Sequence, residues 1–181
     1  EGKVCGPWKI IPNPLNGELP DARKVKKEKK IVTVSRLYIQ KNIPLLLSAF
    51  AEIHKKYPEY RLEIFGEGPL KEKLQELSDE LGICSVVDFK GFCRNVYEQI
   101  QSAEIFVLTS NFEGMSNAML EAIAMGIPSI CTDCPIGGAR MVITNYKNGI
   151  LIPVNDKTSL VCEIDYLLSD RKIRKQIADN G

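Results

Sequence analysis

Two glutamates stand on either side of a polar loop in the middle of the chain. Glu113 and Glu121 are separated by seven residues, among them Gly114, Met115, Ser116 and Asn117. A carboxylate is an acceptor-only group that can take two hydroxyl donors at once, so the pair suits the vicinal hydroxyls of a sugar or a ribose. The spacing alone is weak, because a surface acid and a capping or salt-bridged glutamate also occur eight positions apart.

The residues around this pair read as strand, loop, helix and strand over 106–132. The helix expected over 117–125 is apolar on nearly all sides, which predicts burial, so Glu121 needs a partner. In a parallel α/β sheet, the loops that leave the strand ends line the binding crevice. The next helix directs its positive N-terminus there, which favours phosphate. Phosphate-seeking amides between two carboxylates suit a nucleotide sugar.

Two cations follow an earlier strand, which is expected over 31–35. Arg36 and Lys41 flank the loop after this strand, and that loop should reach the same edge of the sheet as Glu113. Arginine forks onto two phosphate oxygens and lysine adds a compact charge. Together they could neutralise a diphosphate without a metal, although two solvated loop charges would give the same pattern.

The hydrophobic pattern alternates between strand and helix along most of the chain. Strands are expected at 31–35, 61–65, 86–89, 104–109, around Ile130 and at 150–152. Helices are expected at 44–57, 70–81, 95–102, 117–125, 138–144, 160–168 and 170–181. This order predicts an α/β fold, a Rossmann-like, doubly wound parallel sheet with helices on both faces. We expect residues 31–181 to form this domain. Residues 1–30 are expected to be an interdomain segment and basic loop, with a short strand at Ile10 and Ile11.

Composition restricts the function classes. The chain has 181 residues, 44% of them hydrophobic, and a net charge of +1, which is typical of a soluble globular domain and predicts no nucleic-acid partner. No apolar run is long enough for a membrane span. Residues 23–30 carry six cations, which could attract an anionic membrane surface. A solvated linker is favoured, because no amphipathic apolar face accompanies these charges. The chain begins with Glu1, and we expect a fragment of a longer protein.

The sequence lacks the motifs of several common metal, nucleotide and hydrolase sites. Cys131 and Cys134 form a Cys-x-x-Cys, but a structural zinc needs four ligands and the single histidine, His54, lies far away in the sequence. Reduced thiols of a cytosolic protein are the favoured interpretation. The Gly66-Glu67-Gly68 turn lacks the third glycine of a dinucleotide fingerprint. Walker and Ser-His-Asp motifs are absent from the sequence, and no metal site is predicted.

A set of ordered motifs resembles a known family. The chain is similar to the C-terminal domain of retaining glycosyltransferase family 4, the "group 1" glycosyltransferases, from about residue 9 to 180. The motifs that carry the resemblance are Val34-Ser35-Arg36-Leu37, Lys41-Asn42, Gly66-Glu67-Gly68-Pro69-Leu70, Phe89-Lys90-Gly91-Phe92, Glu113 with Glu121-Ala122, and Gly126-Ile127-Pro128.

The resemblance implies a two-domain GT-B fold of which this chain is the donor-binding half, without the N-terminal acceptor-binding half. It implies that Arg36 and Lys41 hold the diphosphate and act in catalysis together with Glu113, which takes sugar hydroxyls. The implied donor-binding residues are Gly66, Phe92, Cys93, Gly114, Met115, Ser116, Asn117 and Glu121. Of these, Glu121 would bind the ribose, and the backbone near Phe92 and Cys93 would meet the base. Many family members have Gly-Phe-Gly after the first glutamate. Gly114-Met115-Ser116-Asn117 departs from it, which leaves the sugar open.

The predicted function is therefore sugar transfer by a hexosyltransferase-type enzyme. The donor is a nucleotide diphosphate sugar, with UDP preferred over GDP, and the acceptor a glycan or lipid-linked glycan in cell-surface polysaccharide synthesis, with retention. No cofactor or metal is expected. The predicted partners are the donor and the missing half of the same chain. The expected localisation is the cytoplasm, with peripheral association at the inner face of the membrane. The fragment alone should bind donor weakly and transfer nothing. Two alternatives stay open: half of a nucleotide-sugar epimerase, and a non-enzymatic nucleotide- or partner-binding module.

Overall fold

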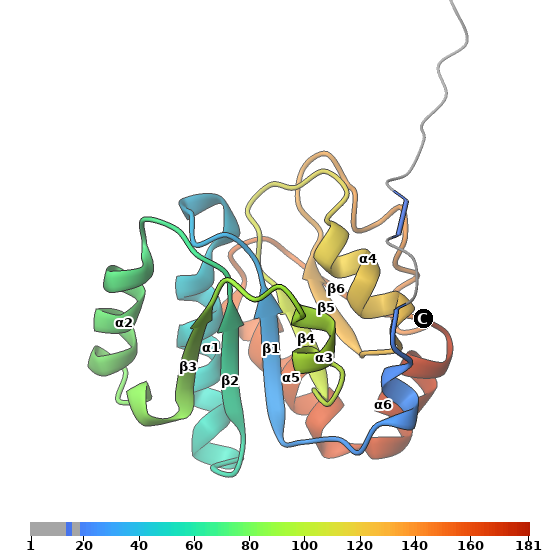
Figure 1. Ribbon diagram of the computed structural model, residues 1–181, viewed down its shortest axis with the longest axis horizontal. Coiled ribbons are helices and arrows are strands. Elements are labelled where there is room, and N and C mark those ends of the chain that lie inside the picture. Colours follow the sequence, from blue (N-terminus) through green and yellow to red (C-terminus); the bar gives the residue numbers. More distant parts are fainter. Residues whose placement is uncertain (1–13, 16–18) are drawn as a thin grey trace, which may run out of the picture.

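A computed structural model describes residues 14–15 and 19–181 of the protein. The short strand predicted at Ile10 and Ile11 lies outside the described residues. The described chain forms a three-layer α/β structure, with one sheet between two layers of helices (Figure 1).

Within the described part of the chain, the central sheet has six parallel strands in the order β3-β2-β1-β4-β5-β6. Their bounds are β1 Lys30–Val34, β2 Arg61–Phe65, β3 Val87–Gly91, β4 Ile105–Leu108, β5 Ser129–Thr132 and β6 Ile150–Ile152. The strand order reverses between β1 and β4, and a doubly wound sheet opens its binding crevice at that point. The loops after these two strands therefore meet at the carboxyl edge of the sheet.

Helices cover both faces of the sheet because side chains alternate along each strand. Ile105 and Val107 pack toward α1, α2, α5 and α6, whereas Phe106 and Leu108 pack toward α3, α4 and η1. The bounds of the first group are α1 Ile43–Lys56, α2 Lys71–Glu80, α5 Lys157–Ser169 and α6 Arg171–Asp179. Those of the second are η1 Ala22–Lys24, α3 Val96–Ile100 and α4 Asn117–Ala124. Two further 3-10 turns are η2 Ile39–Lys41 and η3 Cys84–Val86.

The strands predicted between residues 31 and 152 and all but one of the predicted helices are confirmed, with small shifts at their ends. The helix predicted over 138–144 is wrong: this segment is a series of turns. Ile136 and Gly137 precede it with positive φ angles of 82° and 73°. The turns end where the side-chain oxygen of Asn148 accepts the amide of Thr144 at 2.8 Å. Tertiary contacts therefore override the local preference of this segment.

The basic stretch 23–30 packs against the domain. Four of its six cations form ion pairs with acidic residues, and the ammonium of Lys30 also donates to the carbonyl of Gln99 at 2.9 Å. This pairing compensates part of the positive charge of the stretch. Within the described residues, no helix is both long and apolar enough to cross a membrane.

Candidate functional site

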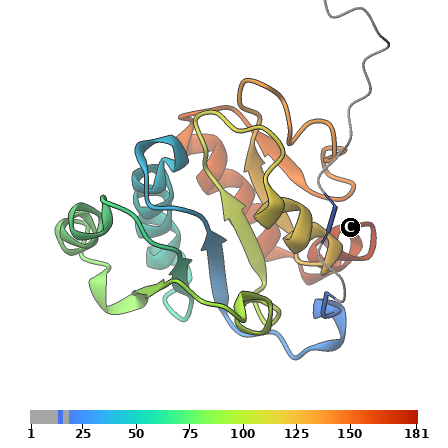
Figure 2. The same cartoon turned by 45° about the horizontal axis from the view of Figure 1, so that its top comes forward.

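The loops after β1 and β4 are joined to each other by hydrogen bonds. The amide of Asn111 donates to the carbonyl of Gln40 at 2.8 Å, and the side-chain amide of Gln40 donates to the carbonyl of Phe112 at 2.9 Å. Nearer the sheet, the hydroxyl of Thr109 donates to the carbonyl of Lys41 at 2.9 Å. Figure 2 brings this carboxyl edge forward. These hydrogen bonds hold the two loops in a fixed arrangement at the reversal of strand order.

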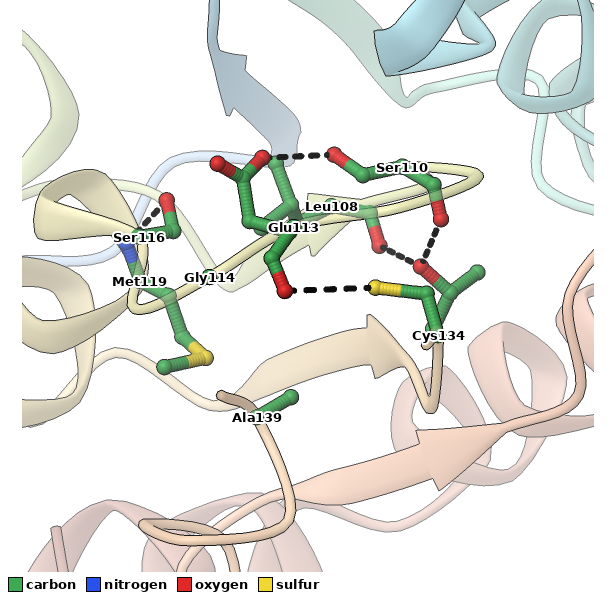
Figure 3. A pocket seen from close by; sticks show the side chains of 9 residues that line it. Leu108, Ser110, Glu113, Gly114, Ser116, Met119, Cys134 and Ala139 are labelled. Atoms are coloured by element: carbon green, nitrogen blue, oxygen red, sulfur yellow. Dashed lines mark hydrogen bonds between the residues drawn. The ribbon is translucent and has the colours of Figure 1, made fainter. Parts of the chain in front are cut away.

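Lys41 and Glu113 form an ion pair at the centre of this edge. The ammonium of Lys41 donates to Oε2 of Glu113, and the side chains are only 10% and 19% exposed. The hydroxyl of Ser110 donates to the same oxygen at 3.0 Å (Figure 3). A buried charge without a partner is costly, so each of the two ions stabilises the other. The structure thus brings together two residues that stand 72 positions apart in the sequence.

Arg36 lies in the same loop as Lys41 but faces outward. Its side chain is exposed, and the guanidinium carbon lies 5.5 Å from the centre of the Tyr38 ring. Among the described residues, no contact joins Arg36 to Glu113. An exposed guanidinium beside the crevice can take an anionic group from solvent without first breaking an ion pair.

The helix α4 begins beside Glu113 and carries the second glutamate. Ser116 is buried at its N-cap, and the Ser116 hydroxyl accepts the amide of Met119 at 3.5 Å. Gly114 and Asn117 are exposed, and Met115 is half-buried. The expectation that α4 is buried on all sides is only partly met, because several of its side chains are half-buried.

Glu121 has the partner that its position demanded. The hydroxyl of Tyr97 donates to Oε1 of Glu121 at 2.8 Å. Tyr97 belongs to α3, which follows the loop containing Phe92 and Cys93. Phe92 is 71% exposed, and Cys93 is half-buried and packs against the core that contains side chains of α3 and α4. The loop predicted to meet a base is therefore linked to the glutamate predicted to meet a ribose.

Gly66 supports the site through its backbone. Its φ angle is +128°, and a Cβ added to it would lie 1.9 Å from the carbonyl oxygen of Ser35. Only a glycine allows the loop after β2 to approach the loop that carries Arg36 so closely. The sequence motif around Gly66 is thus explained by packing behind the crevice.

The loop after β5 forms a further wall that the sequence analysis did not identify. A Cβ added to Gly138 would lie 1.8 Å from the carbonyl oxygen of Gly114, and the Sγ of Cys134 lies 4.0 Å from the carbonyl oxygen of Glu113. A cavity of about 10 Å³ separates this wall from Glu113 (Figure 3). Two adjacent glycines soon after a buried strand are the sequence signal that could have identified the wall.

The two cysteines of the Cys-x-x-Cys motif are buried thiols. Cys131 and Cys134 are free and buried, and burial raises the pKa of both thiols. A thiol with a raised pKa is a poor nucleophile and a poor metal ligand at neutral pH. Among the described residues, no group of three or more His, Cys, Asp and Glu side chains could hold a metal.

Comparisons with known proteins agree with this geometry. The Campylobacter jejuni enzyme named N-acetylgalactosamine-N,N'-diacetylbacillosaminyl-diphospho-undecaprenol 4-alpha-N-acetylgalactosaminyltransferase is 36% identical over 149 residues, which are 82% of this chain and 40% of that protein. The C-terminal domain of a group 1 family glycosyl transferase from Francisella tularensis has a TM-score of 0.77 at 26% identity, covering 87% of this chain and 84% of that one. An S. aureus TarM variant solved with UDP shares the fold, with a TM-score of 0.83 at 24% identity over 90% of this chain and 33% of that one.

The chain covers less than half the length of the curated relatives that head these matches. It spans between 39% and 48% of the length of the first three curated relatives that it matches. The family model described as "Glycosyl transferases group 1" matches residues 18–181. The fold is the Rossmann-like half of a GT-B fold. Because the family model matches most of its residues, the chain belongs to the group 1 glycosyltransferases.

Proposed function

We propose that this chain is the donor-binding domain of a retaining hexosyltransferase that takes its sugar from UDP. The observation that carries the proposal is the buried Lys41–Glu113 pair at the reversal of strand order. In this pair, a cation that can bind phosphate lies beside a carboxylate that can accept hydroxyl groups, near the N-terminus of α4. A nucleotide diphosphate sugar presents both kinds of group within one molecule.

The proposed roles follow from charge. Breaking the bond between sugar and diphosphate builds negative charge on the leaving group. Arg36, Lys41 and the N-terminus of α4 would stabilise that charge from positions fixed before the reaction, so we propose no metal and no cofactor. Glu113 would orient the sugar with the help of the backbone from Gly114 to Asn117, and Glu121 would accept ribose hydroxyls.

The relatives support the choice of substrates. The TarM variant was solved with UDP, and the Campylobacter jejuni relative is named for transfer to a saccharide carried by diphospho-undecaprenol. We therefore propose a glycan or lipid-linked acceptor in cell-surface polysaccharide synthesis, held by a further domain of the complete protein. The reaction would take place in the cytoplasm or at the inner face of the membrane.

The two alternatives are less well supported. An epimerase needs acid and base residues at the sugar, whereas Glu113 is held in an ion pair and Glu121 accepts a tyrosine hydroxyl. A non-enzymatic module predicts that changes of Arg36 or Glu113 leave the activity of the complete protein intact. Sugar transfer that is lost in Glu113→Gln would contradict the module.

Calorimetric titration of the complete natural protein with UDP, GDP and ADP tests the proposal. We expect UDP to bind, and Arg36→Ala and Glu121→Ala to weaken it by about tenfold or more, because each removes a charged hydrogen-bonding group. Arg171→Ala and Glu80→Ala are matched controls, since both residues are exposed on helices of the other face and should leave the affinity unchanged. Equal affinity in all four variants, or no nucleotide binding by the natural protein, would contradict the proposal.

A further inference from the structure

Ser110 contacts the site although the proposed function gives it no task. It follows β4 and is fully buried, with 0% of its surface exposed. Its hydroxyl donates to Oε2 of Glu113 at 3.0 Å, and the ammonium of Lys41 donates to that same oxygen. Two donors of different chemistry therefore converge on a single oxygen of the carboxylate.

The backbone of Ser110 is itself held from the neighbouring strand. The hydroxyl of Thr132, at the end of β5, donates to the carbonyl of Ser110 at 2.6 Å. Thr132 is only 2% exposed. One hydrogen bond thus joins β5 to the backbone of Ser110, and a second joins the side chain of Ser110 to Glu113. The carboxylate is therefore connected to the rigid strand ends rather than to the loop alone (Figure 3).

The second carboxylate oxygen of Glu113 is in a different situation. Among the described residues, no donor reaches Oε1, whereas Oε2 takes two hydrogen bonds. The Glu113 side chain still keeps 19% of its surface exposed. A carboxylate fixed in this way offers one acceptor in one direction, which is what recognition of a single hydroxyl requires.

We propose that Ser110 is a positioning residue for sugar recognition. Together with Lys41 it engages Oε2 of Glu113 and directs Oε1 toward one hydroxyl of the sugar on the donor. This inference rests on the proposed function. It adds a residue that affects sugar binding through Glu113, without itself contacting the sugar. Ser110 should therefore affect the part of donor affinity that comes from the sugar, and leave the part that comes from the nucleoside diphosphate.

The test compares UDP with UDP-sugars in the complete natural protein. Calorimetry gives the Kd of UDP and of UDP-glucose, UDP-galactose and their two N-acetylated analogues. The ratio of the Kd of UDP to that of the tightest UDP-sugar measures the contribution of the sugar. In Ser110→Ala we expect this ratio to fall about tenfold, because a hydrogen bond to a charged group is lost, while the Kd of UDP stays the same.

Two further variants make the result specific. Ser129→Ala is the matched control, because Ser129 is equally buried and its hydroxyl donates to the carbonyl of Ile127 at 2.8 Å, away from the site. It should leave both Kd values unchanged. Adding Ser110→Ala to Glu113→Gln should cause no further fall in the ratio, because the carboxylate that Ser110 positions is already gone.

An unchanged ratio in Ser110→Ala would overturn the inference. If both Kd values rise equally, the ratio is also unchanged, and Ser110 then has a structural role only. If Ser110→Ala does not fold, Thr132→Val removes the hydrogen bond that holds the backbone of Ser110, and an unchanged ratio in that variant would also refute the inference. A natural protein that binds neither UDP nor any UDP-sugar would instead refute the proposed function, and the inference with it.

Discussion

At the scale of single residues, the loops of the site are placed by close approaches between backbones. Gly66 lies against Ser35, and Gly138 lies against Gly114. In each pair, one residue must lack a side chain. Gly114 is different, because a Cβ built on it would meet nothing within 4 Å. Glycines within the same site therefore differ in how much stability depends on them.

This difference predicts unequal effects of two alanine substitutions. Gly66→Ala should lower the free energy of unfolding by about 3 kcal/mol or more, because it adds a backbone clash to a φ angle that alanine rarely adopts. Gly114→Ala should change the free energy of unfolding by about 0.5 kcal/mol or less. Urea unfolding followed by circular dichroism measures both. Equal effects would show that the loop after β2 can move away from Ser35.

At the scale of secondary-structure elements, one arginine holds the last helix to the sheet. Arg174 of α6 pairs with Glu104 at 3.1 Å, and both side chains are 13% exposed. The same guanidinium donates to the carbonyls of Leu167 and Leu168 at the end of α5. The hydroxyl of Tyr60 also donates to Glu104, at 2.5 Å. Arg174 thus connects two helices to the start of β4.

Removing this arginine should be costly. Arg174→Met is expected to lower the free energy of unfolding by about 3 kcal/mol, because Glu104 is left as a buried charge without its cation. Arg171→Met, on the exposed side of the same helix, should cost about 0.5 kcal/mol or less. Chemical unfolding of both variants gives the comparison. In the Glu104→Gln variant, Arg174→Met should lower the free energy of unfolding by less than it does in the natural protein. If the effects of the two substitutions simply add, Arg174 and Glu104 are not energetically coupled.

At the scale of the whole molecule, the charges nearly cancel, with 24 basic and 23 acidic residues. Most of the ion pairs are exposed and contribute little. Lys27 takes part in none of these ion pairs among the described residues, and burial lowers its pKa to about 8. Its ammonium donates to the carbonyl of Gln101 at 3.1 Å. Because of this residue, the free energy of unfolding of the domain should change with pH in the alkaline range.

The sign of that dependence follows from proton binding. The unfolded chain keeps the proton on Lys27 up to about pH 10.4, whereas the folded chain releases it near pH 8. The cost of burying this charge is therefore complete below pH 8 and declines as the pH rises from 8 to about 10. Lys27→Met should be more stable than the natural protein at pH 7, by about 1 kcal/mol after allowance for solvent screening.

Urea unfolding at pH 7 and pH 9.5 measures this effect, with Lys26→Met as the control at an exposed neighbouring position. The advantage of Lys27→Met should shrink at the higher pH, while Lys26→Met should behave alike at both. An advantage of Lys27→Met that is independent of pH would mean that its cause is packing rather than charge.

The sequence alone determined the order and the type of the elements. The strands at 61–65 and 150–152 have the bounds that were expected, because short apolar runs between polar turns are a local signal. Alternating strands and helices also require a parallel sheet, which set Arg36, Lys41 and Glu113 at one edge. The exception was the segment 138–144. Its local pattern predicted a helix, but the segment forms turns, and its first residue, Gly138, lies close to the backbone of Gly114.

Only the tertiary structure decided which of these residues meet. The contacts of Lys41 with Glu113, of Tyr97 with Glu121 and of Gly138 with Gly114 join different loops and helices. They depend on strand order and on the exact height of each loop above the sheet, and no local pattern encodes either. For the same reason, Ser110 and Thr132 were not singled out from the sequence, and the contact of Cys134 with Glu113 was not expected. Their importance comes from what lies beside them in space, because a buried carboxylate needs partners wherever the chain can supply them.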